Sequence, residues 1–119
     1  MNLVMALVLG FFSAKQDEAK EKMAELNARG LAQACEAFYL NPNSNSIFPA
    51  RLAELVNPPF GGASFVRNGA KDLLDPWGKE YKYALETLRD GAQVPRVWTE
   101  RVVNGKAKVY GHKPADKKQ

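Results

Sequence analysis

No proline interrupts the first 41 residues of the chain, and this absence constrains the fold more than any other feature. Residues 3–12, LVMALVLGFF, are apolar apart from one glycine, and residues 14–40 then mix charged and apolar side chains at helical spacing. A single helix over residues 3–40 would be about 55 Å long, with an apolar first part of about 15 Å. That part is about half as long as the hydrocarbon core of a bilayer is thick, so it is too short to span a membrane alone. The sequence predicts one long helix whose start needs lipid or other helices around it and whose end needs a domain core.

The later part of this helix carries one narrow apolar stripe and one belt of charge. The stripe repeats at steps of three and four residues and is expected to face the core; it consists of Ala19, Met23, Leu26, Gly30, Ala34 and Phe38. The belt lies within residues 15–25 and carries both signs, with Lys15, Lys20 and Lys22 against Asp17, Glu18, Glu21 and Glu25. Two roles remain open for the belt: ion pairing between subunits that sets their register, or a solvated helix face.

Beyond the helix, the chain changes to short elements separated by turn-forming residues. Asn41-Pro42 ends the helix, and Pro49 is expected to open a short helix over residues 50–56 that packs back on the long one. Residues 57–72 are rich in proline and glycine and predict an irregular connection. Strands are expected at about residues 79–86, 95–103 and 106–112. Asn104-Gly105, between the last two, is a strong signal for a hairpin with a type I′ turn. This order predicts the α+β class, with the long N-terminal helix packed on a small antiparallel sheet of about three strands.

The segment LLDPWGKEYKY, residues 73–83, predicts a tight turn that leads into the first strand. Asp75 suits the first position, where its carboxylate can accept hydrogen bonds from backbone amides ahead of it, and Pro76 presets φ at the second. Gly78 relieves crowding at the fourth position, and Trp77 is a candidate plug at the corner. All four residues are expected to be structural rather than catalytic.

The composition fits one small domain and gives no support to nucleic-acid binding. The chain has 119 residues and a net charge of +4. Much of the excess lies toward the C-terminus, where five lysines are opposed only by Asp116: Lys106, Lys108, Lys113, Lys117 and Lys118. Such a basic end could contact nucleic acid or acidic lipid. We expect this tail, residues 113–119, to be a flexible, solvated end. Basic and aromatic side chains interleaved on one surface would indicate nucleic-acid binding, and the sequence does not show that pattern. We therefore expect no nucleic-acid partner.

No residue set in the sequence predicts catalysis or cofactor binding. Cys35 is the only cysteine, and its apolar helical context predicts a small buried thiol rather than a nucleophile or half of a disulfide. His112 is the only histidine and lies near the tail, which makes a Cys–His site improbable. Asp72, Asp75 and Glu80 are close in sequence, but turns are rich in carboxylates, and acid–base catalysis needs a specific geometry. We expect no catalytic residue, no cofactor-binding residue and no metal ligand.

The order of these features resembles that of the type IV pilin-like proteins, and most closely that of the major pseudopilins of type II secretion systems. One shared feature is an apolar N-terminal segment that continues into an amphipathic helix ending in an aromatic pair, here Phe38-Tyr39. Another is an aromatic-proline step followed by spaced leucines, here within residues 48–55. The most specific is the DPWG turn of residues 75–78, followed by a charged residue and the pair Tyr81 and Tyr83. The resemblance covers most of residues 5–112.

Two features of that family are missing from this sequence. Its members typically begin with a basic leader, a cleavage site before a phenylalanine and a glutamate five residues into the mature chain, whereas Met1 stands where the middle of the apolar segment is expected. We expect either a truncated start or a member that has lost this processing. The major pseudopilins also carry an acidic calcium-binding loop near the C-terminus. The matching residues 111–118 hold a single aspartate among lysines, which is a poor host for calcium, so no calcium site is expected.

The resemblance implies a structural subunit of a type II secretion pseudopilus rather than an enzyme. Residues 1–14 would hold the subunit in the cell inner membrane as a single-pass anchor, and residues 15–112 would form a globular domain in the periplasm. Subunits would stack helix to helix into a filament that drives protein export. The implied membrane and assembly residues are Leu3, Val4, Leu7, Val8, Leu9, Phe11 and Phe12. The implied partners are copies of the chain, other pseudopilins, the inner-membrane secretion platform and the lipid bilayer.

The alternative is a small secreted or periplasmic binding module with a cleaved N-terminal signal peptide. The apolar segment lacks a positively charged region before it, and Phe12 stands where cleavage prefers a small residue. A mature chain that begins near Lys15 would favour this alternative.

Overall fold

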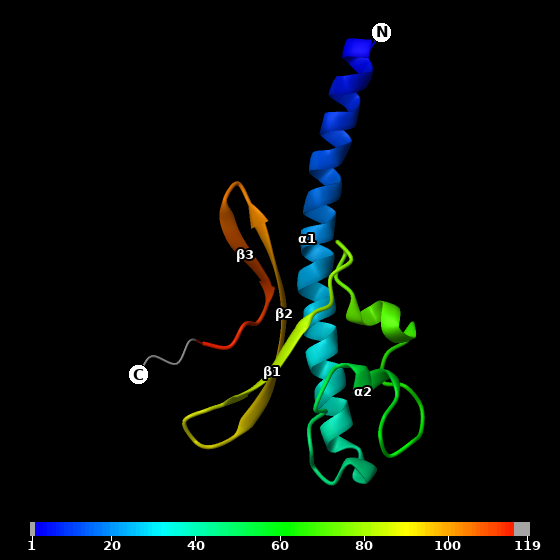
Figure 1. Ribbon diagram of the computed structural model, residues 1–119, viewed down its shortest axis with the longest axis vertical. Coiled ribbons are helices and arrows are strands. Elements are labelled where there is room, and N and C mark those ends of the chain that lie inside the picture. The colour runs from blue at the N-terminus through cyan, green and yellow to red at the C-terminus, as the bar shows by residue number, and fades with distance from the viewer. Residues whose placement is uncertain (1, 116–119) are drawn as a thin grey trace.

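The protein is a long helix packed on one face of a small antiparallel sheet, as the sequence predicts (Figure 1). The computed structural model describes the backbone of residues 2–115 and the side chains of residues 18–115. Its elements in chain order are α1 (Asn2–Leu40), η1 (Pro42–Ser44), α2 (Ala53–Val56), η2 (Gly69–Leu73), β1 (Lys82–Thr87), β2 (Gln93–Val103) and β3 (Lys106–Gly111). The overall dimensions are 63 × 40 × 15 Å, because α1 extends well past the sheet at its N-terminal end (Figure 1).

The face of α1 that packs on the domain is not the predicted stripe. The buried side chains of the helix are Ala24, Ala28, Leu31, Cys35 and Phe38. Of the predicted stripe only Phe38 is buried, and Met23 and Leu26 are 52% and 62% exposed. The two faces have the same helical spacing, so periodicity alone does not separate them.

Small residues at the contact explain why the sheet packs on the face of α1 that contains Ala28. A Cβ atom built on Gly111, at the end of β3, would lie only 2.7 Å from the Cβ of Ala28. The end of β3 therefore passes almost in contact with α1, which requires alanine on the helix and glycine on the strand. Larger side chains such as Met23 and Leu26 would hold the two elements apart.

The sheet has the strand order β1-β2-β3 with both pairs antiparallel. Asn104 and Gly105 connect β2 to β3 with φ angles of 53° and 76°, as the expected type I′ turn requires. β1 begins at Lys82, three residues later than predicted, because the preceding residues are bonded to the turn before them: the Tyr81 amide donates to the Leu73 carbonyl (2.9 Å).

The segment between α1 and the sheet completes the core at the C-terminal end of α1. Leu55 of α2 is fully buried, and Phe38 of α1 packs on Phe60 and Phe65 with ring centroids 5.1 and 5.5 Å apart. The expected short helix does not open at Pro49: α2 begins at Ala53, and Pro49 is instead a buried packing residue whose carbonyl accepts a hydrogen bond from Tyr83 (2.7 Å).

Candidate assembly site and the Asp75 turn

The predicted membrane and assembly residues lie in the part of α1 that projects beyond the sheet. Leu3, Val4, Leu7, Val8, Leu9, Phe11 and Phe12 all fall within α1, and their side chains lie outside the described residues. Among the described side chains of α1, the first buried one is Ala24. The core of the domain therefore draws on the later part of α1.

Within the part of the chain that the structure describes, no helix combines the length and the apolar character that a membrane span needs.

The DPWG turn is built around the buried carboxylate of Asp75, which is 5% exposed. One carboxylate oxygen accepts hydrogen bonds from the backbone amides of Trp77 (3.0 Å) and Lys79 (2.8 Å). The other accepts a hydrogen bond of 2.5 Å from the hydroxyl of Thr99, a residue of β2 that is 2% exposed. Gly78 has a φ of 87°, which favours glycine, and its amide bonds to the Asp75 carbonyl at 3.0 Å. Asp75 therefore forms hydrogen bonds both within the turn and to the central strand, β2.

Trp77 lies at the corner of this turn, between the turn and the sheet. Its ring centroid is 5.3 Å from that of Tyr110, and the Arg101 guanidinium carbon lies 4.4 Å from the centre of its ring. The indole Nε1 is buried with no hydrogen-bond partner among the described residues. Trp77 therefore joins the turn to β2 and β3 mainly through packing and a cation–π contact.

Two glutamates of the charged belt hold α1 to β3, a role that the sequence analysis missed. The Glu21 carboxylate accepts a hydrogen bond from the Tyr110 hydroxyl (2.6 Å) and lies 3.5 Å from the Lys108 ammonium. The Glu25 carboxylate accepts a hydrogen bond from the Gly111 amide and also lies 3.5 Å from Arg29. The bond from Tyr110, with the charge of Lys108 added to it, lowers the pKa of Glu21 below its usual 4.5. These contacts are within one chain, so part of the belt is neither free for a neighbour nor simply solvated.

Further charged residues lie on the face of the sheet that is turned away from α1. Arg96 of β2 donates to Glu86 of β1 at 2.6 Å, and this bond lowers the pKa of the Glu86 carboxyl. Glu100 lies 3.1 Å from Lys82 and 3.3 Å from Lys113. The hydrogen bond from Lys82 is the main cause of the lowered pKa of Glu100.

The buried thiol of Cys35 is unreactive because its surroundings keep it protonated. Its side chain is 0% exposed, and burial raises its pKa to about 12. The neighbouring Tyr83 also has its pKa raised, again mainly by burial. A thiol that stays protonated at neutral pH is a poor nucleophile, which agrees with the packing role predicted for Cys35.

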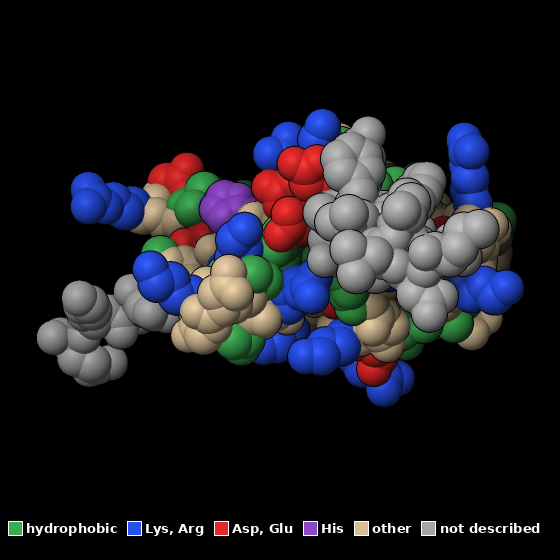
Figure 2. Space-filling model, turned by 90° about the horizontal axis from the view of Figure 1, so that it is seen from above, with side chains coloured by type: hydrophobic (Ala, Val, Ile, Leu, Met, Phe, Trp, Pro, Cys, Tyr) green, Lys and Arg blue, Asp and Glu red, His purple; other side chains and the backbone are tan. Residues whose placement is uncertain are grey.

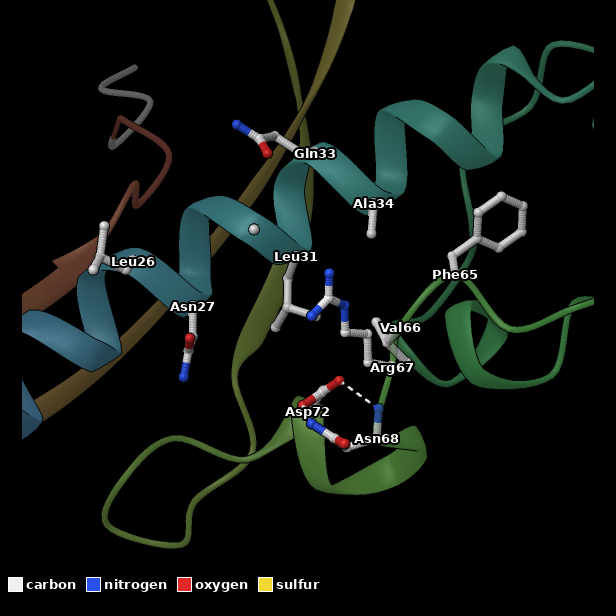
Figure 3. A pocket seen from close by; sticks show the side chains of 11 residues that line it. Leu26, Asn27, Leu31, Gln33, Ala34, Phe65, Val66, Arg67, Asn68 and Asp72 are labelled. Carbon is white, nitrogen blue, oxygen red and sulfur yellow. Dashed lines mark hydrogen bonds between the residues drawn. The ribbon is translucent and has the colours of Figure 1, made fainter.

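A groove of about 520 Å³ runs between α1 and the loop before β1 (Figure 3). Leu26, Asn27, Gln33 and Ala34 line one side, and Phe65, Val66, Arg67, Asn68 and Asp72 line the other. The only carboxylate in this lining is already bonded locally: Asp72 accepts from the Asn68 amide at 2.9 Å, as the dashed line in Figure 3 shows. Asp72, Asp75 and Glu80 do not form a common site, because Asp75 is buried against Thr99 whereas Glu80 is exposed.

Within the described residues, no three side chains of histidine, cysteine, aspartate or glutamate come together as a metal site would require.

The chain matches the family model for the type II secretion system (T2SS), protein G, over residues 12–98. The chain belongs to the type II secretion system protein G family. The match extends from residue 12 of α1 through the DPWG turn and into β2. It includes the Phe38-Tyr39 pair, the aromatic-proline step and the DPWG turn, whereas residues 3–11 of the apolar segment lie outside it. Neither a curated protein nor a solved structure matches the chain significantly.

Proposed function

We propose that the protein is a pseudopilin, a structural subunit of a type II secretion filament. The N-terminal segment would hold it in the inner membrane with the globular domain in the periplasm. Copies of the chain and other pseudopilins would then stack helix to helix into a filament whose growth, at the inner-membrane secretion platform, drives protein export. Membership of the protein G family over residues 12–98 is the observation that carries this proposal.

The arrangement of α1 supports a subunit with two separate surfaces. Among the described side chains of α1, the first buried one is Ala24, and the N-terminal end of the helix projects beyond the sheet (Figure 1). Residues 3–12 have an apolar sequence, and burying such a segment would stabilise the protein by about 10–20 kcal/mol. Before assembly, lipid would bury this apolar segment, and after assembly the helices of neighbouring subunits would bury it. The same segment would therefore hold the subunit in the membrane and later join it to the filament.

The contacts of two chemically notable groups support a structural role for them. The buried carboxylate of Asp75 accepts three hydrogen bonds from groups of its own chain, two backbone amides and the Thr99 hydroxyl. The thiol of Cys35, the only cysteine, is buried, and its raised pKa keeps it protonated at neutral pH. Neither group is available to a substrate.

We also propose that the subunit folds without calcium. The chain after β3 begins with His112 and Lys113, and Lys113 pairs with Glu100 (3.3 Å). A cation site would need several hard oxygen ligands there, and lysine ammonium groups would repel it. A chelator should therefore leave the melting temperature unchanged.

The alternative, a secreted binding module with a cleaved signal peptide, is favoured by no described contact. The groove in Figure 3 would be its binding site, and its lining is mixed, with one cation and several amides. Sequencing the N-terminus of the protein made in its native host separates the two functions, because the module predicts a mature chain that starts near Lys15.

Deletion of residues 1–13 tests the proposed function directly. The described core begins at Ala24, so the truncated chain should fold and remain monomeric, whereas the full chain should sediment with membranes and enter filaments. Circular dichroism, ultracentrifugation and membrane flotation measure the three properties. A truncated chain that unfolds or aggregates would show that the apolar segment belongs to the globular core and would contradict the proposal.

A further inference from the structure

We propose that the tip of the β2–β3 hairpin is a second membrane contact, which lies against anionic lipid headgroups while α1 is anchored. This inference rests on the proposed function, because it needs the N-terminal segment in a bilayer. Beyond the proposed function, it assigns a membrane-facing surface to the globular domain and identifies anionic lipids as the class that this surface contacts.

The first observation that supports this inference is the position of the hairpin tip along the axis of α1. Lys108 and Tyr110 of β3 both contact Glu21, whereas Gly111 contacts Glu25, so β3 runs beside α1 with its tip toward the N-terminus of the helix (Figure 1). The Asn104-Gly105 turn lies three or four residues before Lys108, which is about 10–13 Å along a strand. An α-helix covers that length in about seven to nine residues. Counted back from Glu21, the tip is level with about residues 12–14, where the apolar segment ends.

The charge of the hairpin is the second support. Residues 101–109, RVVNGKAKV, contain three basic side chains and no acidic one. The helix beside them is balanced, because residues 15–22 contain equal numbers of lysines and acidic residues. Lys108 lies 3.5 Å from Glu21 and the Arg101 guanidinium lies over Trp77, so Lys106 is the basic side chain for which we infer a headgroup contact. Figure 2 looks onto this end of the domain from above, and Lys and Arg side chains are spread around that face with Asp and Glu side chains among them.

The exposed apolar side chains of the hairpin are the third support. Val102 is 71% exposed and Val109 is 42% exposed. They lie on the sheet face turned away from α1, since Lys108 and Tyr110, at the alternate positions of β3, contact the helix. Val102 is paired across the strands with Ala107, so the outer face near the tip is apolar. With the tip at a bilayer surface, the valines on the outer face would enter the interface, while Lys106, which shares the face of Lys108, would meet phosphate from the other side of the hairpin.

The combination favours a membrane over a second copy of the chain. An anionic headgroup layer is a flat and uniformly negative surface at the level where the anchor enters the bilayer. The carboxylates of α1 next to the hairpin, Glu21 and Glu25, already accept hydrogen bonds from β3 of their own chain, so they are not the partners that we infer for the hairpin of another copy.

A fluorophore at the tip tests the inference in the full chain. Val102→Cys would be labelled with an environment-sensitive dye and the protein reconstituted into phosphatidylcholine vesicles with or without phosphatidylglycerol. Cys35 should not be labelled, because it is fully buried. An Asn43→Cys label, in η1 beyond the C-terminal end of α1, is the matched control. We expect brominated lipid to quench the dye at position 102 in anionic vesicles, less in neutral vesicles or high salt, and not to quench the dye at position 43.

Lys106→Gln should reduce the ratio of bound to free tip about fivefold, the effect of one basic residue near an anionic surface. Lys71→Gln, which removes an exposed charge in η2, should leave the ratio unchanged. If the protein floats with vesicles but the dye at position 102 is not quenched, the inference fails and the proposed function stands. If the protein does not float at all, the anchor and therefore both proposals fail. A lipid-independent dye shift that grows with protein concentration would assign the tip to a second copy and overturn the inference.

Discussion

Replacement of Asp75 by alanine removes the group that fastens the DPWG turn to the sheet. The carboxylate accepts three hydrogen bonds, from the backbone amides of Trp77 and Lys79 and from the Thr99 hydroxyl. Asp75→Ala leaves all three donors without this acceptor. It should therefore destabilise the domain without changing any exposed surface.

The size of the effect follows from which donors water can reach. Thr99 is 2% exposed, and a buried hydroxyl left without a partner costs about 1–3 kcal/mol. The two backbone amides are only partly buried and can regain water, so they add about 1 kcal/mol together. Together these losses amount to about 2–4 kcal/mol. For a domain of this size, that lowers the melting temperature by about 10–20 °C.

Urea unfolding followed by far-ultraviolet circular dichroism measures this loss without depending on Trp77, which lies in the same turn. Asp72→Ala is the matched control: Asp72 is a nearby aspartate that bonds to Asn68 at the surface, and its loss should cost less than about 1 kcal/mol. Thr99→Val alone should cost about 1 kcal/mol, and the double variant should cost clearly less than the sum of the single ones.

Two results would refute this reasoning. An Asp75→Ala variant within about 0.5 kcal/mol of the wild type would show that the turn does not depend on the buried carboxylate. A strictly additive double variant would show that the short bond to Thr99 contributes no coupling.

Three further changes test the packing and the charges. Leu31→Ala should cost about 2–5 kcal/mol and Leu26→Ala less than about 0.5 kcal/mol, because these residues are 3% and 62% exposed; similar losses in urea unfolding would restore the predicted stripe. Gly111→Ala should cost about 3 kcal/mol or more by thermal unfolding, because φ is 102° and the new Cβ would lie 2.4 Å from a carbonyl oxygen of β2; a wild-type melting temperature would show that β3 and α1 are not so close. The Tyr110 hydrogen bond lowers the pKa of Glu21 in the folded state, so its contribution is present above about pH 4.5 and is lost as pH falls through the lowered pKa. Urea midpoints measured against pH should therefore fall less steeply in acid for Tyr110→Phe, and identical profiles would contradict this role.

Much of the architecture could be predicted because it depends on local signals. Continuous helical residues up to Asn41-Pro42 specify α1, and Asn104-Gly105 specifies the turn between the last two strands. The turn at Asp75 was also expected, although its bond to Thr99, 24 residues away, was not. A local pattern predicts backbone conformation but does not identify partners that are distant in sequence.

The errors in the predicted core have the same cause. Two faces of α1 carry apolar residues at helical spacing, and the choice between them depends on how closely β3 approaches Ala28. The roles of Glu21 and Glu25 likewise depend on donors located 86 or more residues further along the chain. Helical periodicity contains no information about either contact.

The sequence by itself determined a proline-free helix with an apolar start, the positions of the main turns and strands, and the resemblance to a secretion filament subunit. Only the tertiary structure decided which face of α1 is buried, which part of the charged belt is bonded within the chain, and how far the β2–β3 hairpin reaches toward the N-terminus. The physical reason is that backbone preferences act over a few neighbouring residues, whereas close packing and buried hydrogen bonds join groups that meet only after the sheet has formed against the helix.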